Sequence, residues 1–445
     1  MPYRDFLKAA ASVTPSPRQL AWFDTEFYAF VHFTVNTYTN LEWGDGTEDP
    51  AIFNPTELDC DSWVEAVKSA GMKGIVLTAK HHDGFCLWPS AYTDHSVKRS
   101  PWKNGQGDVV RECAEACRRG GIKFGVYLSP WDRNCPLYGS DAYNDFYCGQ
   151  LTELLTNYGE LFMVWFDGAC GEGPNGKRQT YDFDRYISLI RKYQPNAAIF
   201  SDAGPDVRWC GNEAGLSRAA EWAVVPSELC LYAEVQTGAG PLAGDLSYLY
   251  NDDPYIGELH NILQSRGLAF CGAEVDMSIR PGWFWHADQE PHSTERLLRT
   301  YIHSCGGNTT FHLNIPPMPS GRFDPRDVAR LKEFGHALRE AFGEDKKVQA
   351  AVTVIPAEEG NQVRYEIALP EKTHVRYVEL REDLTHGQRI ESFRILAADG
   401  GCACNGRTVG HRRICEIDRA AKQITVQITA ARDRVFLRDL TVYQA

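Results

Sequence analysis

The fold is decided by the stretch Leu161-Phe162-Met163-Val164-Trp165-Phe166-Asp167-Gly168-Ala169-Cys170, an unbroken apolar run that ends in a carboxylate and a glycine. A run of about six apolar residues bounded by turn residues is typical of a strand buried on both faces, as in parallel sheets. Asp167 then lies at the carboxyl end of the strand, where parallel α/β folds place their chemistry. Because an Asp before a Gly is also ordinary turn chemistry, the rest of the chain has to decide between a catalytic and a turn interpretation.

Helix and strand patterns alternate on both sides of this stretch. Strand patterns cover 27–34, 74–80, 122–128, 161–167, 197–202, 273–279 and 309–315, with a further candidate at 229–235. Helix patterns cover 61–71, 108–119, 142–158, 182–193, 255–266, 293–304 and 324–342. This alternation predicts a parallel α/β fold, and about eight strands predict a (β/α)8-type barrel.

The pattern changes after Gly343 to short alternating runs separated by turns, such as 364–369, 375–380 and 424–428. Runs of this kind without a long helix predict a C-terminal β-sandwich of about 95 residues. A chain of 445 residues is also too long for one ordinary core. We therefore expect two domains, a catalytic barrel over residues 1–345 and a C-terminal β-sandwich over residues 346–445.

Composition excludes several classes of protein. With 43% apolar and 24% charged residues the chain reads as a folded globular protein, and its net charge of −13 argues against a nucleic-acid partner. The 14 cysteines show no CxxC pair of the structural zinc type, so we expect mostly reduced, buried thiols.

No targeting signal is visible in the sequence. The first residues, Met1-Pro2-Tyr3-Arg4-Asp5, do not resemble a signal peptide, and no run of about 18 apolar residues predicts a membrane span. A cytoplasmic location is the default expectation, and a leader removed from the chain would make the protein secreted instead. The oligomeric state is not predicted.

A barrel would bring chemically active side chains to one rim. The strand ends supply His32, His81, His82, Tyr127 and Asp167, and Glu213 follows in a later loop. Two carboxylates with imidazoles and nearby tryptophans favour a carbohydrate site, since neither GxGxxG after a strand nor GxxxxGK[ST] occurs.

A metal site is the alternative use of this histidine-rich rim. His81-His82-Asp83 could serve as ligands on an amidohydrolase-like barrel. Adjacent residues on a regular strand point to opposite sides, and His32-Phe33-Thr34 lacks the histidine pair with which such barrels begin. We therefore expect neither a metal nor another cofactor.

Glycoside hydrolysis needs a carboxylate beside the anomeric carbon and a proton donor near the leaving oxygen. Asp167, placed rigidly at a strand end, suits a nucleophile. Glu213 lies in a loop next to glycines, which suits an acid/base that reaches the leaving group.

Six motifs carry a resemblance to a known family. They are His32-Phe33-Thr34, Glu42-Trp43, His81-His82-Asp83-Gly84-Phe85, Tyr127-Leu128-Ser129-Pro130-Trp131, Trp165-Phe166-Asp167-Gly168 and Arg280-Pro281-Gly282-Trp283-Phe284. Together and in this order they resemble the α-L-fucosidases of glycoside hydrolase family 29. The resemblance covers the whole predicted barrel.

The resemblance implies a retaining exo-α-L-fucosidase that works through a covalent fucosyl-enzyme. Asp167 matches the family nucleophile, and Gly211-Asn212-Glu213 resembles the acid/base motif of the subgroup that acts on α-1,3/1,4-fucosyl branches of Lewis type. Gly44 stands where the broad-specificity subgroup tends to carry an aromatic residue. The implied partner is a fucosylated oligosaccharide or glycoconjugate, bound by residues at matching positions, which are His32, Glu42, Trp43, His81, His82 and Tyr127, with Trp285 as an apolar wall for the fucose methyl.

Alternatives remain open at this point. In a retaining enzyme the two carboxyls lie about 5–5.5 Å apart, so the Glu213 loop should fold back over Asp167. Glu221, Glu228 and Glu274 are other acidic residues in or beside the predicted rim.

The alternative functions are a broad-specificity fucosidase, a non-catalytic protein that binds fucosylated glycans, and a metal hydrolase. For the C-terminal domain we favour a structural role over sugar binding.

Overall fold

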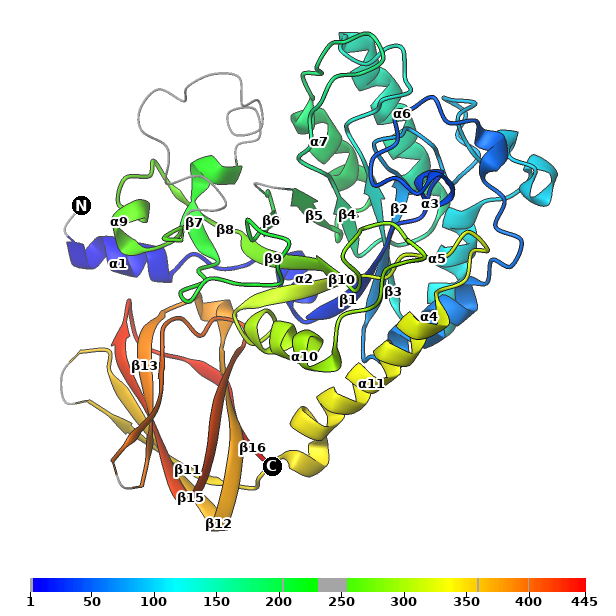
Figure 1. Cartoon of the computed structure of the whole chain (residues 1–445). Helices are drawn as coiled ribbons and strands as arrows, with labels where there is room; N and C mark the ends of the chain where they lie inside the picture. The colour runs from blue at the N-terminus through cyan, green and yellow to red at the C-terminus, as the bar shows by residue number, and fades with distance from the viewer. Residues whose placement is uncertain (1–2, 202–203, 231–253, 358–359, 399) are drawn as a thin grey trace.

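Eight parallel strands close into a barrel (Figure 1). The computed structural model describes residues 3–201, 204–230, 254–357, 360–398 and 400–445. In hydrogen-bonded order the barrel strands are β1 (Phe27–Val31), β2 (Gly74–Lys80), β3 (Lys123–Leu128), β4 (Met163–Trp165), β5 (Ala198–Ser201), β6 (Val207–Trp209), β9 (Gly272–Ser278) and β10 (Thr309–Asn314). The predicted barrel is confirmed.

Long helices pack around the barrel. They are α4 (Cys60–Ser69), α5 (Val109–Gly120), α6 (Asp141–Asn157), α7 (Phe183–Tyr193), α10 (Thr294–His303) and α11 (Pro325–Phe342). Most of them begin at a side-chain cap; Asp59, Asp108 and Asp182, for example, each accept a backbone N–H of the first turn. The predicted helices agree with these bounds to within about two residues.

Shorter elements connect and cover the strands. The short helices are α1 (Tyr3–Ala11), α2 (Pro17–Phe23), α3 (Asn36–Thr39) and α9 (Leu259–Ile262). The 3₁₀ turns are η1 (Pro50–Ile52), η2 (Val97–Arg99), η3 (Trp102–Gly105), η4 (Ser227–Cys230), η6 (Glu344–Lys346) and η7 (Leu384–His386). β7 (Val224–Pro226) and β8 (Leu268–Phe270) form an antiparallel pair beside the barrel.

The eighth strand is not the one that the sequence predicts. β6 supplies it, whereas Leu229 of the candidate stretch 229–235 lies in η4 and residues 231–235 fall outside the described residues. β6 has three residues, and residues 204–206 before it form no helix, so the alternation that reveals the other strands is missing.

The predicted helix 255–266 is also too long. Only α9 is helical there, because Gly257 adopts a left-handed backbone with φ +79° and stops a helix from starting earlier.

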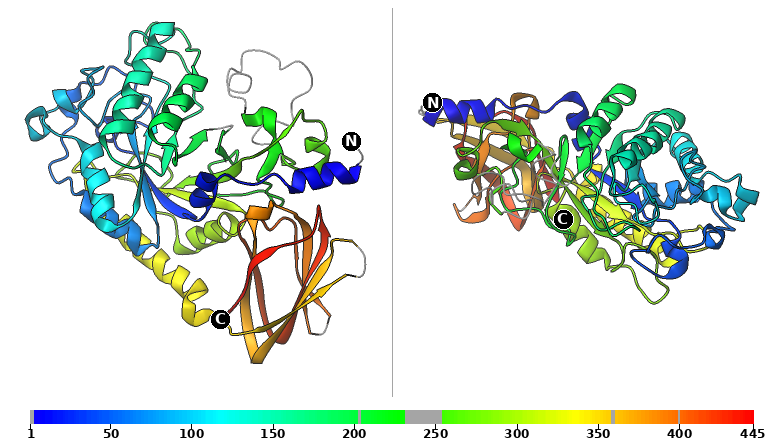
Figure 2. Two further views of the ribbon diagram at one scale, coloured as in Figure 1. Left: turned by 180° about the vertical axis from the view of Figure 1, so that it is seen from behind. Right: turned by 90° about the horizontal axis from the view of Figure 1, so that it is seen from above.

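The C-terminal region folds as an antiparallel domain with its own core (Figure 2). Its strands are β11 (Ala351–Pro356), β12 (Val363–Glu382), β13 (Ile390–Ala397), β14 (Cys402–Gly406), β15 (Arg413–Ala431) and β16 (Leu437–Gln444). The predicted all-β domain is confirmed, and hydrogen bonds join its six strands in one sheet because β12 and β15 pair along most of their lengths. The domain boundary predicted at 345/346 lies in η6 and stays a prediction.

Two further expectations concern cysteines and helices. The cysteines whose side chains the structure describes are free thiols, most of them buried. None of the described helices is long and apolar enough to cross a membrane.

A buried ionic network joins the C-terminal domain to the amino end of β1. Arg412 donates to Glu379 at 2.7 and 3.0 Å, to Tyr301 Oη at 2.7 Å and to Glu26 at 3.4 Å. Burial raises the pKa of Glu26, but Arg412 and Arg381 outweigh it and lower that pKa to about 2. The domain is therefore attached to the end of the barrel opposite the carboxyl rim.

Replacing Arg412 should destabilise the contact between the barrel and the C-terminal domain. Arg412→Ala leaves Glu26 and Glu379 buried without their main counter-ion, so the free energy of unfolding should fall by about 3–5 kcal/mol in chemical denaturation. Arg438→Ala is the control, because Arg438 is 47% exposed and its contact with Asp24 is a surface ion pair that contributes less than about 1 kcal/mol. Equal losses for the two variants would contradict the assignment.

Candidate active site

The carboxyl ends of the first four strands bring the predicted rim residues together. The His32 and His81 rings lie 5.5 Å apart, and the His81 ring stacks on Tyr127 at 5.8 Å. His82 Nε2 lies 3.8 Å from Asp167 Oδ2. These contacts place His32, His81, His82, Tyr127 and Asp167 in one group.

Asp167 is fixed through both carboxylate oxygens. Oδ1 accepts the backbone N–H of Ala169 at 2.8 Å, and Oδ2 accepts the Tyr127 hydroxyl at 3.0 Å. The side chain is 25% exposed, so the carboxylate is held rigidly and still meets the opening of the barrel. The turn bond expected for an Asp before a Gly is thus present, and it also orients the carboxylate.

His82 presents a lone pair toward Asp167. Ser129 Oγ donates to the carbonyl of Trp131 at 2.7 Å, so it accepts from His82 Nδ1, also at 2.7 Å. Burial lowers the pKa of His82, and the neutral ring then carries its proton on Nδ1. Nε2 and Asp167 Oδ2 are two acceptors that a single hydroxyl donor can approach together.

His32 is oriented by Asn314. The Asn314 amide nitrogen donates to the Trp283 carbonyl at 2.7 Å and to Ser278 Oγ at 2.9 Å, so its oxygen accepts His32 Nδ1 at 2.9 Å. Burial lowers the pKa of His32 to about 3 although the Asn314 bond opposes the change. His32 is therefore neutral with Nε2 as an acceptor.

His81 completes the set of neutral imidazoles. Burial, followed by the charges that His82 and His32 would carry if protonated, lowers the pKa of His81 well below its usual value. Its Nδ1 is buried and has no hydrogen-bond partner among the described residues. A buried polar atom of this kind is available to a ligand.

Glu42 joins the loop after β1 to the loop after β9. Its Oε2 accepts the backbone N–H of Trp283 at 2.8 Å, and its Oε1 lies 2.6 Å from His286 Nε2. A Cβ on Gly282 would collide with Oε1, so a larger residue there would displace the Glu42 carboxylate. Glu42 therefore holds Trp283 in place, in addition to the substrate-binding role predicted for it.

Trp43 lies at the mouth of the group. Its side chain is 56% exposed, and its ring stands at a right angle to His82, 5.6 Å away, and to Trp131, 5.5 Å away. An exposed indole beside a polar pocket suits contact with a sugar ring.

Glu213 reaches the site through Trp283. Trp283 Nε1 donates to Glu213 Oε2 at 3.2 Å, and the Trp283 ring lies 5.1 Å from His32. Partial removal from water raises the pKa of Glu213, and the charges of Asp167 and Glu42 raise it further against the Trp283 bond. Glu213 is thus a carboxyl that keeps its proton more readily than usual, near the carboxylate of Asp167.

Trp285 does not join this group. Its Nε1 donates to Asp324 Oδ2 at 3.0 Å, at the start of α11. Trp283, two residues earlier, lies beside His32 instead. The role predicted for Trp285 as an apolar wall thus fits Trp283.

A buried carboxylate lies in the barrel lumen beneath the group. Glu274 accepts Trp165 Nε1 at 2.8 Å and also pairs with His312 Nδ1 at 3.1 Å and with the Tyr28 hydroxyl. Trp165 stacks on Tyr127 at 5.2 Å, which links Glu274 to the Asp167 network.

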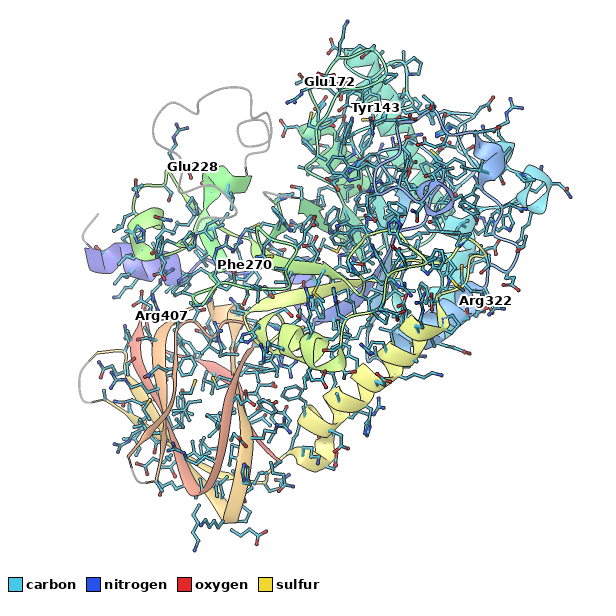
Figure 3. The ribbon with its side chains drawn as sticks, in the orientation of Figure 1. Tyr143, Glu172, Glu228, Phe270, Arg322 and Arg407 are labelled. Atoms are coloured by element: carbon cyan, nitrogen blue, oxygen red, sulfur yellow. The ribbon has the colours of Figure 1, made fainter. Side chains whose placement is uncertain are left out.

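The other acidic candidates are occupied elsewhere. Glu221 forms a buried ion pair with Arg208, and Glu228 accepts the backbone N–H of Arg266 at 2.5 Å. Figure 3 shows Glu228 on the part of the molecule formed by β7, η4 and β8. Neither carboxylate belongs to the group around Asp167.

The site also contains residues that the sequence does not predict, among them Ser129, Ser278 and Asn314. The signal for two of them is polar alternation, since Ser278 ends the run Gly272–Ser278 and Asn314 ends the run Thr309–Asn314, where every second residue is polar. In a barrel such residues face the lumen.

The group around Asp167 coincides neither with the cavity described next nor with a set of metal ligands. A cavity of about 680 Å³ lies near the amino ends of β3 and β4, lined by residues that include Trp22, Lys123 and Phe162, and no predicted site residue lines it. Among the described residues, no three His, Cys, Asp or Glu side chains are grouped so that they could hold a metal ion.

Comparisons with known proteins agree on one family. The family model described as Alpha-L-fucosidase matches residues 11–224. Alpha-L-fucosidase 1 of Arabidopsis thaliana is 42% identical over 431 residues, which are 90% of this chain and 81% of the relative. A putative alpha-L-fucosidase from Bacteroides ovatus has 43% identity and a TM-score of 0.90 over 99% of this chain and 76% of its own. A GH29 fucosidase of Ruminococcus gnavus, solved in complex with fucose, has 28% identity and a TM-score of 0.82 over 98% and 95% of the two chains.

The protonation of His32 can be tested directly. NMR of histidine-labelled protein should show His32 neutral at every pH above about 5, whereas Asn314→Asp should raise its pKa by about one unit or more, because a carboxylate favours the imidazolium. The ring signals of the exposed His374, which pairs with Asp418, should be the same in both proteins and serve as the control. Titration of wild-type His32 near its ordinary pKa would contradict the tautomer assignment.

Proposed function

The chain belongs to the glycoside hydrolase family 29 α-L-fucosidases, and from this premise we propose that it is a retaining exo-enzyme that removes α-1,3- or α-1,4-linked fucose from Lewis-type branched glycans. Its class, a glycoside hydrolase with α-L-fucosidase activity, follows from the family. The observation that carries the proposed mechanism is the pairing of a rigid carboxylate, Asp167, with a carboxyl of raised pKa, Glu213.

In the first step Asp167 attacks the anomeric carbon while the bond from that carbon to the leaving oxygen breaks. Glu213 gives its proton to the leaving oxygen, so the aglycone departs as a neutral alcohol and a fucosyl ester remains on Asp167. In the second step Glu213, now ionised, takes a proton from water, whose oxygen attacks the anomeric carbon and releases Asp167. Two displacements at one carbon retain its configuration.

The surrounding residues suit a terminal deoxy-sugar. His32 Nε2, His82 Nε2 and Asp167 Oδ2 offer acceptors to sugar hydroxyls, and the Trp283 ring offers an apolar surface to the methyl group. Because the imidazoles are buried and Trp43 lies exposed beside His82, we expect one terminal sugar to bind against the imidazoles and the rest of the glycan to stay outside.

Two features support the branch-specific subgroup over the broad-specificity alternative. Gly211-Asn212-Glu213 resembles its acid/base motif. A Cβ on Gly44 would lie 2.5 Å from Asn36 Oδ1 and close to the Glu48 carboxylate, so an aromatic residue at this position would require both side chains to move.

Release of free L-fucose from defined glycans tests the proposal. A Lewis-type trisaccharide should be hydrolysed with EDTA present, an α-1,2-fucosylated lactose should not, and Asp167→Ala should lower the rate by about a thousand-fold or more because the nucleophile is lost. Asp61→Ala, at a 58% exposed carboxylate on the outer helix α4, is the matched control and should keep full activity.

Each other outcome favours a different function. Comparable release from both glycans would remove the linkage claim, and inhibition by EDTA would favour a metal hydrolase. Binding without any release would favour the non-catalytic glycan-binding protein.

The pH profile tests the role of Glu213. With a nitrophenyl fucoside, kcat/KM of the wild type should fall as the pH rises through the raised pKa of Glu213, because the acid loses its proton there. Glu213→Gln should lose the part of this alkaline limb that belongs to Glu213 while the nitrophenolate still leaves unaided, so that only the fall caused by other groups stays, and its kcat/KM for the Lewis trisaccharide should fall by about 10²–10⁴. An unchanged alkaline limb in the variant would assign the acid to another group.

A further inference from the structure

A third carboxyl group, that of Asp276, faces the lumen near Glu213. Glu274 and Ser278, two residues before and after it on β9, both bond to lumen side chains, so the alternation of the strand places Asp276 on the same side. Trp209, at the end of β6, donates its Nε1 to Asp276 Oδ1 at 2.9 Å, and the side chain of Asp276 is 4% exposed. Within the described part of the chain, Oδ2 has no hydrogen-bond partner.

Asp276 lies within reach of the sugar-binding residues. Ser278 bonds to Asn314, which in turn holds the ring of His32. Asp276 is one inward step below Ser278, roughly 7 Å along the strand. Its carboxyl therefore lies one inward step deeper in the lumen than Ser278, beside the Trp209 indole.

Hydrogen-bond donors decide which lumen carboxyl keeps a proton. Glu274 is bonded by Trp165, His312 and Tyr28. Apart from its own backbone N–H, the Asp276 carboxyl is bonded by the Trp209 indole alone among the described residues, and no described cation bonds to it. Since buried like charges cannot all ionise, the proton goes to the carboxyl with the fewest donors.

The site also needs a donor. The free nitrogens of His32 and His82 are acceptors, Asp167 is a carboxylate, and the Tyr127 hydroxyl is already given to Asp167. These groups take the protons of sugar hydroxyls. Among the imidazoles and carboxyls named so far, only the N–H of neutral His81 and the proton of Glu213 can donate, so acceptors outnumber donors around the oxygen lone pairs of the sugar.

We propose that Asp276 is a neutral carboxylic acid whose Oδ2–H donates a hydrogen bond to an oxygen of the bound sugar, which makes it a further substrate-binding residue. This assignment rests on the proposed fucosidase function. Burial, against the Trp209 bond and with the charges of Glu274 and Glu213, raises the pKa of Asp276 well above its usual value, in agreement with the geometry.

The titratable groups around Asp276 define the pH dependence. Glu274 lies beside it on β9, Glu213 and Cys210 lie on the segment after β6, and His312, opposite it on β10, is turned to Glu274. Loss of the Asp276 proton at high pH removes the donor and adds a charge next to Glu213 and Glu274. Sugar binding therefore weakens on the alkaline side.

Calorimetric binding of L-fucose in a Glu213→Gln background tests the proposal, because that background removes the titration of the acid/base. Asp276→Asn keeps an acceptor for Trp209 and a donor in place of Oδ2–H, so its affinity at neutral pH should stay within about three-fold and should not weaken on the alkaline side. Asp276→Ala should bind about ten-fold or more weakly.

A matched control separates binding from stability. Glu382→Gln neutralises a buried carboxyl of the C-terminal domain that accepts three backbone N–H groups, and it should lower the melting temperature without changing fucose affinity. Full affinity of Asp276→Ala would overturn the proposal, as would an Asp276→Asn variant that binds as weakly as Asp276→Ala or keeps the alkaline limb. If wild-type enzyme releases no fucose from any glycan, the proposed function itself fails, which is a distinguishable result.

Discussion

The barrel depends on one carboxylate that has no contact with water. Glu274 lies fully buried in the lumen, where an ionised group is costly by several kcal/mol unless donors surround it. Its partners come from β1, β4 and β10, so satisfying this one charge brings strands from distant parts of the chain together. Through Trp165 and Tyr127 the same network reaches Asp167. The packing of the core and the orientation of the proposed nucleophile are therefore consequences of the same constraint.

Above this floor the chemistry is set by burial. The imidazoles of His32, His81 and His82 are neutral because water is excluded from them, and Asn314 and Ser129 hold the protons of His32 and His82 toward the protein. The Nε2 atoms of His32 and His82 are therefore acceptors. Glu42 then connects two loops by binding Trp283, which also contacts Glu213. The site thus combines a rigid acceptor-rich pocket with a proton-holding carboxyl at its opening.

Sequence patterns predicted the parts of this arrangement that have a regular period. The strand before Asp167 and the capped helices agree with the structure, because regular hydrophobic periods and turn residues mark such elements in the sequence. The sequence does not reveal β6, since three residues without a preceding helix carry no period. Trp283 lies beside His32, whereas Trp285 bonds to Asp324, and the sequence alone does not distinguish the two tryptophans. Glu42 binds the backbone of Trp283 and Asp324 binds the indole of Trp285, and such contacts between distant parts of the chain are not encoded in the local sequence. Every second residue of β9 is polar. This alternation predicts that Glu274 and Asp276 point into the barrel lumen.

The central claim is that Asp167 forms a covalent bond to fucose. A 2-fluoro-substituted α-L-fucosyl fluoride tests it, because the fluorine at C2 slows both steps while the good leaving group lets the first step proceed, so the intermediate accumulates. Mass spectrometry of the digested enzyme should then find the added sugar on the peptide that contains Asp167. A label on another residue, or full turnover without any labelled peptide, would contradict the account.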